Sequence, residues 1–219
     1  MNWFQLILKM EYVHGNTTIY DWVGDIKTVN SIKSKIHKIE KSKLLSKKNS
    51  YEGELCKIMG WTEKLCRHAD AVHTDGTDIE IKKSAGAIIF DAVRYAELRI
   101  SEEHDDGIHV LIIFKKKNDK FNISDVLLVP NWMIIQLIIP DIKYAYNTVA
   151  DFKFRRQKKQ GYNSQILIRA SVLIDSLNNI DMNHNIESRP CLEDSQLFFW
   201  TFYLNCYILI LIFIFYKPK

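Results

Sequence analysis

The residues whose types and spacing could do chemistry lie in one stretch, from Ala69 to Ser84, where charged and apolar side chains alternate. Read with the two-residue period of a strand, Asp78, Glu80 and Lys82 project from one face, and the two isoleucines between them project from the other. The stretch therefore predicts a strand with a charged face backed by an apolar one.

The same stretch predicts a β-hairpin, because Asp75-Gly76 between two strand-forming runs is a strong turn signal. We expect Ala69–Thr74 to be the partner strand and Asp75-Gly76-Thr77 to be the loop. A shorter loop would turn Asp70 to the apolar face, where a carboxylate is costly to bury. The predicted cross-strand pairs are Thr74 with Asp78, Val72 with Glu80, and Asp70 with Lys82.

This pairing brings two carboxylates and one ammonium group to a common face. Carboxylates on neighbouring strands can share Mg²⁺, a hard cation that prefers oxygen ligands and keeps several waters. A lysine beside them can orient or deprotonate the attacking water and stabilise charge on a phosphate. Asp70, Glu80 and Lys82 are therefore candidate catalytic residues, and the two acids are candidate Mg²⁺ ligands. Asp75 and Asp78 remain alternatives to Asp70.

The pattern D70-x9-E80-I81-K82 resembles the bipartite signature of the PD-(D/E)xK nucleases, the restriction-endonuclease-like superfamily. The proline that often precedes the aspartate is absent, and His68-Ala69 stands in its place. The resemblance implies a Mg²⁺-dependent endonuclease that hydrolyses double-stranded DNA, most like the type II restriction enzymes. It also implies that the main-chain carbonyl of Ile81 contributes to the metal site.

A glutamate on the helix before the hairpin often helps to hold the metal in this family. The sequence predicts such a helix from about Tyr51 to Cys66, with Ser50 as its N-cap. We favour Glu54 over Glu52 as the fourth catalytic residue, because Gly53 beside it allows close approach to the hairpin. The simpler interpretation is that acidic side chains favour helix N-termini in any case.

The elements around the hairpin predict the fold class. We expect a helix from Ala85 to about Ile100, with Arg94 pointing outward, then a doubly covered strand at Ile108–Phe114 and another strand at Asn122–Val129. This order resembles the αβββαβ core of the same nuclease family over residues 50–130, with the first core strand folded into the hairpin. The expected fold is thus α/β, with a mixed central sheet flanked by helices.

The regions on either side of this core carry basic residues. Residues 1–49 include an amphipathic helix, Asp25 to about Ser46, whose lysines lie mostly away from its isoleucine face. Residues 131–196 interleave aromatic and cationic side chains, as in the segment from Lys143 to Lys159. Both regions suit a DNA surface, although ordinary solvated faces have the same composition.

The last part of the sequence is strongly apolar. The segment from Leu197 to Tyr216 carries no charge and has the length of a membrane-spanning helix, so a tail anchor is one interpretation. A buried strand pair and an extension outside the working domain are the other two. Membrane tethering is expected only through this segment.

Composition excludes several classes of protein. The 219 residues, nearly half of them hydrophobic, suffice for one core, and a net charge of +4 demands no polyanionic partner. Four cysteines without a C-x-x-C pair favour a reducing, intracellular compartment. There is no phosphate-binding glycine loop and no G-x-S-x-G or H-E-x-x-H motif.

The leading prediction is therefore a Mg²⁺-dependent DNA endonuclease of the type II restriction kind. A homodimer is favoured, because palindromic DNA sites match a two-fold protein. The first alternative is a non-catalytic nucleic-acid-binding protein of the same fold, in which Glu80 and Lys82 form an ion pair on a strand. The second is an accessory protein anchored in a membrane through Leu197–Tyr216.

Overall fold

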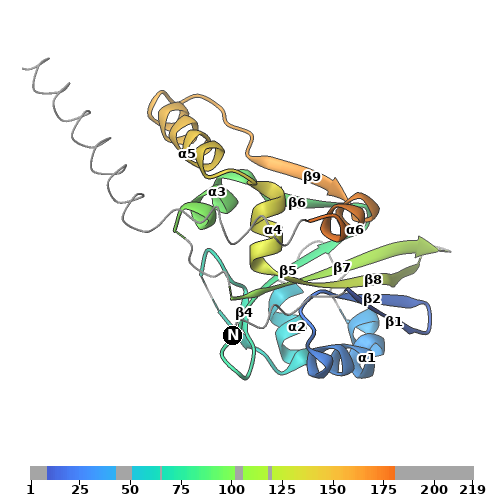
Figure 1. The fold of residues 1–219 in the computed structure, drawn as a ribbon. Coiled ribbons are helices and arrows are strands. Elements are labelled where there is room, and N and C mark those ends of the chain that lie inside the picture. The colour runs from blue at the N-terminus through green and yellow to red at the C-terminus, as the bar shows by residue number, and fades with distance from the viewer. Residues whose placement is uncertain (1–8, 43–50, 65, 102–105, 118–119, 181–219) are drawn as a thin grey trace, which may run out of the picture. The chain divides into compact units, whose positions relative to one another are not determined.

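The computed structural model describes residues 9–42, 51–64, 66–101, 106–117 and 120–180 (Figure 1). A seven-stranded mixed sheet with the strand order β1-β2-β8-β7-β5-β4-β3 forms its centre. The strands of this sheet are β1 (Met10–His14), β2 (Thr17–Asp21), β3 (Thr62–Glu63), β4 (Ala71–Val72), β5 (Asp78–Ser84), β7 (Ile108–Lys117) and β8 (Lys120–Pro130).

A second, two-stranded antiparallel sheet pairs β6 (Ala87–Asp91) with β9 (Gln165–Arg169). The helices are α1 (Ile26–Lys41), α2 (Tyr51–Met59), α3 (Ala92–Ser101), α4 (Asn131–Ile138), α5 (Ile142–Gln157) and α6 (Ala170–Asn178).

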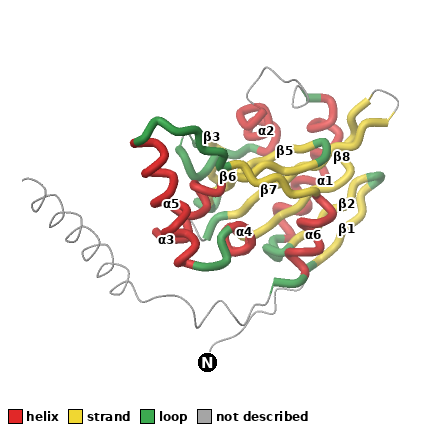
Figure 2. Tube along the Cα trace, turned by 90° about the horizontal axis from the view of Figure 1, so that it is seen from above, coloured by secondary structure: helices red, strands yellow, loops and turns green. Residues whose placement is uncertain are grey.

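Helices cover both faces of the large sheet, as Figures 1 and 2 show. One face packs against α1 and α2. The other face packs against α3, α4 and α6, together with β6, and α5 packs on α3. Because the sheet is enclosed between two apolar layers, its central strands must be apolar on both sides.

The central pair β7 and β8 meets this requirement and confirms the two strands expected there. Val110 and Ile112 of β7 face the α1 and α2 layer, while Leu111 and Ile113 face the other layer. Strand β5 runs parallel to β7 and lies beside it in the sheet. A parallel neighbour requires a crossover, which the chain makes through β6 and α3.

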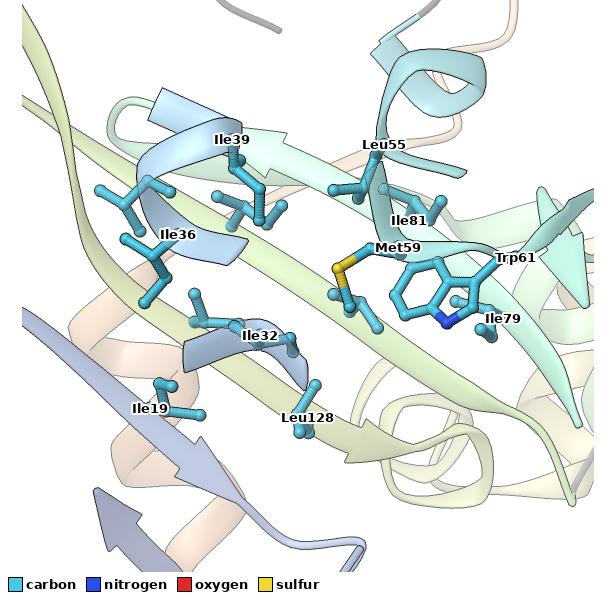
Figure 3. Close-up of a cluster of buried hydrophobic side chains, with 14 of the residues drawn as sticks. Ile19, Ile32, Ile36, Ile39, Leu55, Met59, Trp61, Ile79, Ile81 and Leu128 are labelled. Carbon is cyan, nitrogen blue, oxygen red and sulfur yellow. The ribbon is translucent and has the colours of Figure 1, made fainter. Parts of the chain in front are cut away.

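The core on the α1 and α2 side is built from isoleucine and leucine side chains that meet the apolar face of β5 (Figure 3). Ile32 and Ile36 of α1, with Leu55 of α2, pack in the same cluster as Ile79 and Ile81. The apolar face predicted for the Ile79–Ile81 stretch is therefore buried as expected, which leaves the charged face of β5 turned the other way.

Local signals explain where the first two helices begin and end. Asp25 caps α1, since its carboxylate accepts hydrogen bonds from the main-chain amides of Lys27 and Thr28. The second helix is shorter than predicted and ends at Met59 rather than Cys66. Gly60, with a φ of 77°, takes the left-handed conformation that terminates helices.

The helix expected from Ala85 to about Ile100 is wrong in its first half. Residues 87–91 form β6, which pairs with β9 about eighty residues later in the chain. The helix begins only at Ala92, where Asp91 accepts hydrogen bonds from the amides of Val93 and Arg94. Pairing with so distant a strand overrides the local helical pattern.

The α/β class with a mixed sheet is confirmed. From residue 51 to residue 117 the chain order is α2, β3, β4, β5, β6, α3 and β7. Strand β3, Thr62–Glu63, occupies residues for which the sequence predicts the end of the helix Tyr51–Cys66. The predicted apolar segment Leu197–Tyr216 lies outside the described residues. Within the described ranges, no helix combines the length and the apolarity needed to cross a membrane.

The packing predicts which substitutions in α1 affect stability. Ile32 is almost fully buried, so Ile32→Ala should lower the free energy of unfolding by about 2–4 kcal/mol. Ser34→Ala, two residues away on the exposed side of α1, should change it by less than about 0.5 kcal/mol. Chemical denaturation of both variants measures the difference, and equal losses would contradict the assigned buried face of α1.

Candidate active site

The hairpin that carries the candidate site has the predicted loop length but a different position. The main-chain amide of His73 donates to the carbonyl of Thr77 at 2.8 Å, which makes Thr74, Asp75 and Gly76 the loop. Gly76 takes a left-handed φ of 94°, and Asp75 accepts a hydrogen bond from the Thr77 amide. The hairpin loop therefore begins one residue earlier than the sequence predicts.

This shift corrects the predicted cross-strand partners but keeps their faces. Val72 pairs with Asp78 rather than with Glu80, and Ala71 pairs with Ile79. The register ends at Ala71, because the amide of Asp70 donates to the carbonyl of Ile79 at 2.9 Å. Asp70 therefore lies beside Ile79 and Ile81 rather than opposite Lys82, and the charges of Glu80 and Lys82 both act on its carboxylate.

Asp70 lies at the edge of β5, one residue before β4. Its Oδ2 accepts a hydrogen bond from the main-chain amide of Ile81 at 2.7 Å. Burial and then the charge of Glu80 raise the pKa of Asp70 to about 6, although the Ile81 bond acts to lower it. The two acids are thus close enough to repel each other in a partly buried setting.

Glu80 is nearly fully buried and holds two cations. Its Oε1 accepts hydrogen bonds from Lys82 Nζ at 2.8 Å and from Arg94 Nη1 at 2.7 Å. Its Oε2 accepts a further bond from Arg94 Nη2. Burial acts to raise the pKa of Glu80, but the bonds and charges of Arg94 and Lys82 outweigh it and lower that pKa.

Arg94 is a residue of the site that the sequence reading missed. It was expected to point outward from a helix that began at Ala85, but the helix begins at Ala92 and directs Arg94 at the charged face of β5. No feature of the D-x9-ExK pattern includes it. The only signal available was an arginine in the apolar segment that follows the acidic strand.

The main chain of Ile81 faces the same side as Asp70. Its amide donates to Asp70, and its carbonyl accepts a hydrogen bond from the Tyr51 hydroxyl at 3.4 Å. Both groups lie on the edge of β5 away from β7, and β4, which pairs only with Asp78 and Ile79, leaves them uncovered. The carbonyl expected to contribute to metal binding is bonded to Tyr51.

The acid of α2 that acts on the site is Glu52. Its charge raises the pKa of Asp70, and its side chain is hydrogen bonded to Tyr51. The structure does not bring Glu54 into any described contact with Asp70 or Glu80. A catalytic role for Glu54 stays a prediction. Glu52, the acid of α2 that the sequence analysis did not favour, is the one whose charge acts on Asp70.

The two alternatives to Asp70 have other partners. Both carboxylate oxygens of Asp78 accept hydrogen bonds from Lys64 Nζ, at 2.7 and 2.9 Å. Asp75 lies in the exposed loop, where it caps the Thr77 amide and pairs with His73. Of these three aspartates, only Asp70 lies against Ile81 and the acid of Glu80.

Behind Glu80, a buried polar chain runs through the neighbouring strand. His109 is the β7 partner of Glu80 in the sheet register. Its Nδ1 lies 2.7 Å from the amide oxygen of Asn131, and its Nε2 lies 2.7 Å from the Tyr95 hydroxyl. An amide oxygen only accepts, so Nδ1 carries a proton. Burial lowers the pKa of His109 to about 3, so the ring is neutral at pH 7 and Nε2 accepts from Tyr95.

The donor set at this edge fits a hard cation in its chemistry. It offers the carboxylates of Asp70 and Glu80 and the carbonyl of Ile81, which are all oxygen ligands. The repulsion between the two acids is the imbalance that a divalent ion would relieve. In the described part of the chain, no group of three or more His, Cys, Asp or Glu side chains gathers as a metal site.

Comparison with known proteins adds no assignment. No protein-family model, no curated protein and no solved structure matches the chain.

The buried imidazole predicts how stability depends on pH. Burial lowers the pKa of His109 from 6.5 to about 3; Lys82 and Arg94 also lower it, whereas Glu80 and the bond to Asn131 oppose this. Between pH 6.5 and pH 3 the unfolded chain binds a proton that the folded protein does not. The free energy of unfolding should fall over this range by up to about 5 kcal/mol.

Denaturant unfolding of wild type and His109→Gln at a series of pH values checks this. Glutamine keeps one donor and one acceptor but does not titrate, so the variant should lose less stability on acidification. The carboxylates are common to both proteins and cancel in the comparison. Parallel pH profiles would contradict a neutral, buried His109.

Proposed function

We propose that this protein is a Mg²⁺-dependent deoxyribonuclease that hydrolyses phosphodiester bonds, with a site of the PD-(D/E)xK type. The observation that carries the proposal is the convergence of Asp70 and Glu80, from opposite arms of one hairpin, with Lys82 bonded to Glu80 on the same face. Two acids and an ammonium group in this arrangement suit hydrolysis of a phosphate diester.

Each residue has a defined part in the proposed reaction. Asp70, Glu80 and the Ile81 carbonyl would hold Mg²⁺, which supplies positive charge to stabilise the pentavalent phosphate. Lys82 lies only partly exposed beside Glu80. Its ammonium group orients the attacking water by hydrogen bonding and offers donors to a phosphate oxygen. Glu52, near Asp70, adds to the negative potential that favours a cation at the site.

The order of elements supports the same family. A helix, three antiparallel strands, a crossover helix and a parallel strand follow one another as α2, β3, β4, β5, α3 and β7, with β6 as an addition. This order resembles the αβββαβ core of the restriction-endonuclease-like family. It supports the finer proposal of a double-stranded DNA endonuclease of the type II restriction kind, which would act as a homodimer on palindromic sites.

The basic regions offer different surfaces for DNA. Some lysines of α1 have structural partners: Lys35 donates to the carbonyl of Met59, and Lys33 lies over the ring of Tyr12. The end of α5 is freer, with Phe154 about half exposed among arginines and lysines. Exposed aromatic and cationic side chains together suit contacts to bases and phosphates, so α5 is the better candidate surface.

A second candidate function is a nucleic-acid-binding protein that does not cut. The favouring observation is that both oxygens of Glu80 are already bonded to cations, as a purely structural ion pair would be. In that case Glu80 would join α3 to the sheet, and the basic surfaces alone would contact DNA.

The test is cleavage of plasmid DNA with Mg²⁺ by wild type and single variants. Glu80→Gln and Asp70→Asn should abolish cleavage, because each removes a metal-binding charge. Lys82→Ala should slow it by about 10²- to 10⁴-fold, the range for loss of a positioned proton donor or acceptor. Glu52→Gln and Glu54→Gln together decide which acid of α2 contributes.

Asp75→Asn is the matched control, since it neutralises an acid of the same hairpin in the exposed loop. It should cut like wild type. Equal cutting by Glu80→Gln and wild type would show that the site is wrongly assigned. DNA binding without cutting by the wild-type protein would favour the second candidate.

A further inference from the structure

Arg94 meets Glu80 through two hydrogen bonds. Its two Nη atoms meet the two oxygens of Glu80, which is the bidentate geometry of a strong arginine–carboxylate pair. The Arg94 side chain is 15% exposed and that of Glu80 is 3% exposed. Screening by water is therefore weak for this pair.

These contacts use up most of the capacity of Glu80 to bind another cation. Oε1 accepts two hydrogen bonds, from Arg94 and from Lys82, and Oε2 accepts one from Arg94. A carboxylate oxygen has two lone pairs, so Oε1 has none left. A divalent cation that approached Oε2 would also meet the positive charge of the guanidinium directly beside it.

The charges of the site lead to the same conclusion. The acids Asp70, Glu80 and Glu52 carry three negative charges against the two positive charges of Lys82 and Arg94. With Arg94 in place, one net negative charge is left to attract Mg²⁺. If Arg94 leaves, two remain, and Glu80 Oε2 is no longer bonded to a cation.

The position of Arg94 in its own helix favours a mobile role. It lies in the first turn of α3, where a positive side chain is disfavoured by the helix dipole. Its buried Nε has no hydrogen-bond partner within the described ranges. The guanidinium of Arg94 is thus bonded to Glu80 through its Nη atoms, and the charge of Asp70 also acts on it.

We propose that Arg94 is a positioning residue that clamps Glu80 in the metal-free protein and competes with the divalent cation for that carboxylate. Metal binding at Asp70 and Glu80 then requires that Arg94 release at least one oxygen. This inference rests on the proposed metal-dependent function and adds the step that precedes it. It also explains how a buried acid stays charged and ordered before the metal arrives.

The experiment measures metal affinity rather than activity. Isothermal titration of Mg²⁺ and of Mn²⁺ into wild type and Arg94→Gln, at one pH and one salt concentration, compares the dissociation constants. Arg94→Gln should bind either metal about 10- to 100-fold more tightly, since charge-assisted hydrogen bonds of this kind no longer have to be broken. Arg94→Lys keeps the charge but cannot bond both oxygens of Glu80 at once. Its metal dissociation constants should therefore lie between those of wild type and Arg94→Gln.

Arg99→Gln is the matched control, because it removes an arginine from the same helix and should leave the metal affinity unchanged. Thermal unfolding gives a second measurement. Without metal, Arg94→Gln should melt below wild type, because Glu80 loses its partner. Saturating metal should raise its melting temperature more than that of wild type.

The possible results separate this inference from the proposed function. Wild type that binds metal and cuts DNA, with Arg94→Gln and Arg94→Lys binding metal no more tightly, would overturn the competition and leave the nuclease proposal intact. Wild type that neither binds metal nor cuts would overturn both. If Arg94→Gln does not fold, the comparison of Arg94→Lys with wild type decides alone.

Discussion

The buried carboxylate of Glu80 is the constraint on which the rest of the site depends. A charge at this depth is costly unless it is fully hydrogen bonded, and here a lysine two residues along the strand and an arginine from the next helix supply the bonds. Strand β5 supplies Glu80 and Lys82, and the crossover to β7 supplies Arg94. The same requirement therefore links the chemistry of the strand to the position of α3.

The two faces of β5 have different roles in the fold. On one face, isoleucines pack against α1 and α2 and hold the strand in register. On the other, acids and cations form a partly buried polar layer, backed by the neutral His109 and its two partners. Asp70 is held beside this layer by its hydrogen bonds to the main chain of Ile79 and Ile81.

Local patterns predicted the parts of this arrangement that depend on neighbouring residues. The two-residue alternation of β5, the continuous apolar run of β7 and the facing of Asp70 toward Glu80 follow from the sequence because burial acts on each side chain separately. The strand β6 and the role of Arg94 could not be predicted this way. They depend on β9, which lies far along the chain, and a helical pattern from Ala85 onward competes with that pairing. The choice between Glu52 and Glu54 depends on the rotation of α2, which a short helix leaves open.

Because β4 is short, Asp70 has a structural role at the edge of β5. Because β4 pairs with β5 only at its start, the carboxylate of Asp70 takes the place of a missing strand by accepting the Ile81 amide. Asp70 is thus a candidate metal ligand that also covers part of the open edge of β5. An alanine at this position would uncover a main-chain donor as well as remove a charge, whereas asparagine keeps an acceptor there. Only the second substitution separates chemistry from architecture.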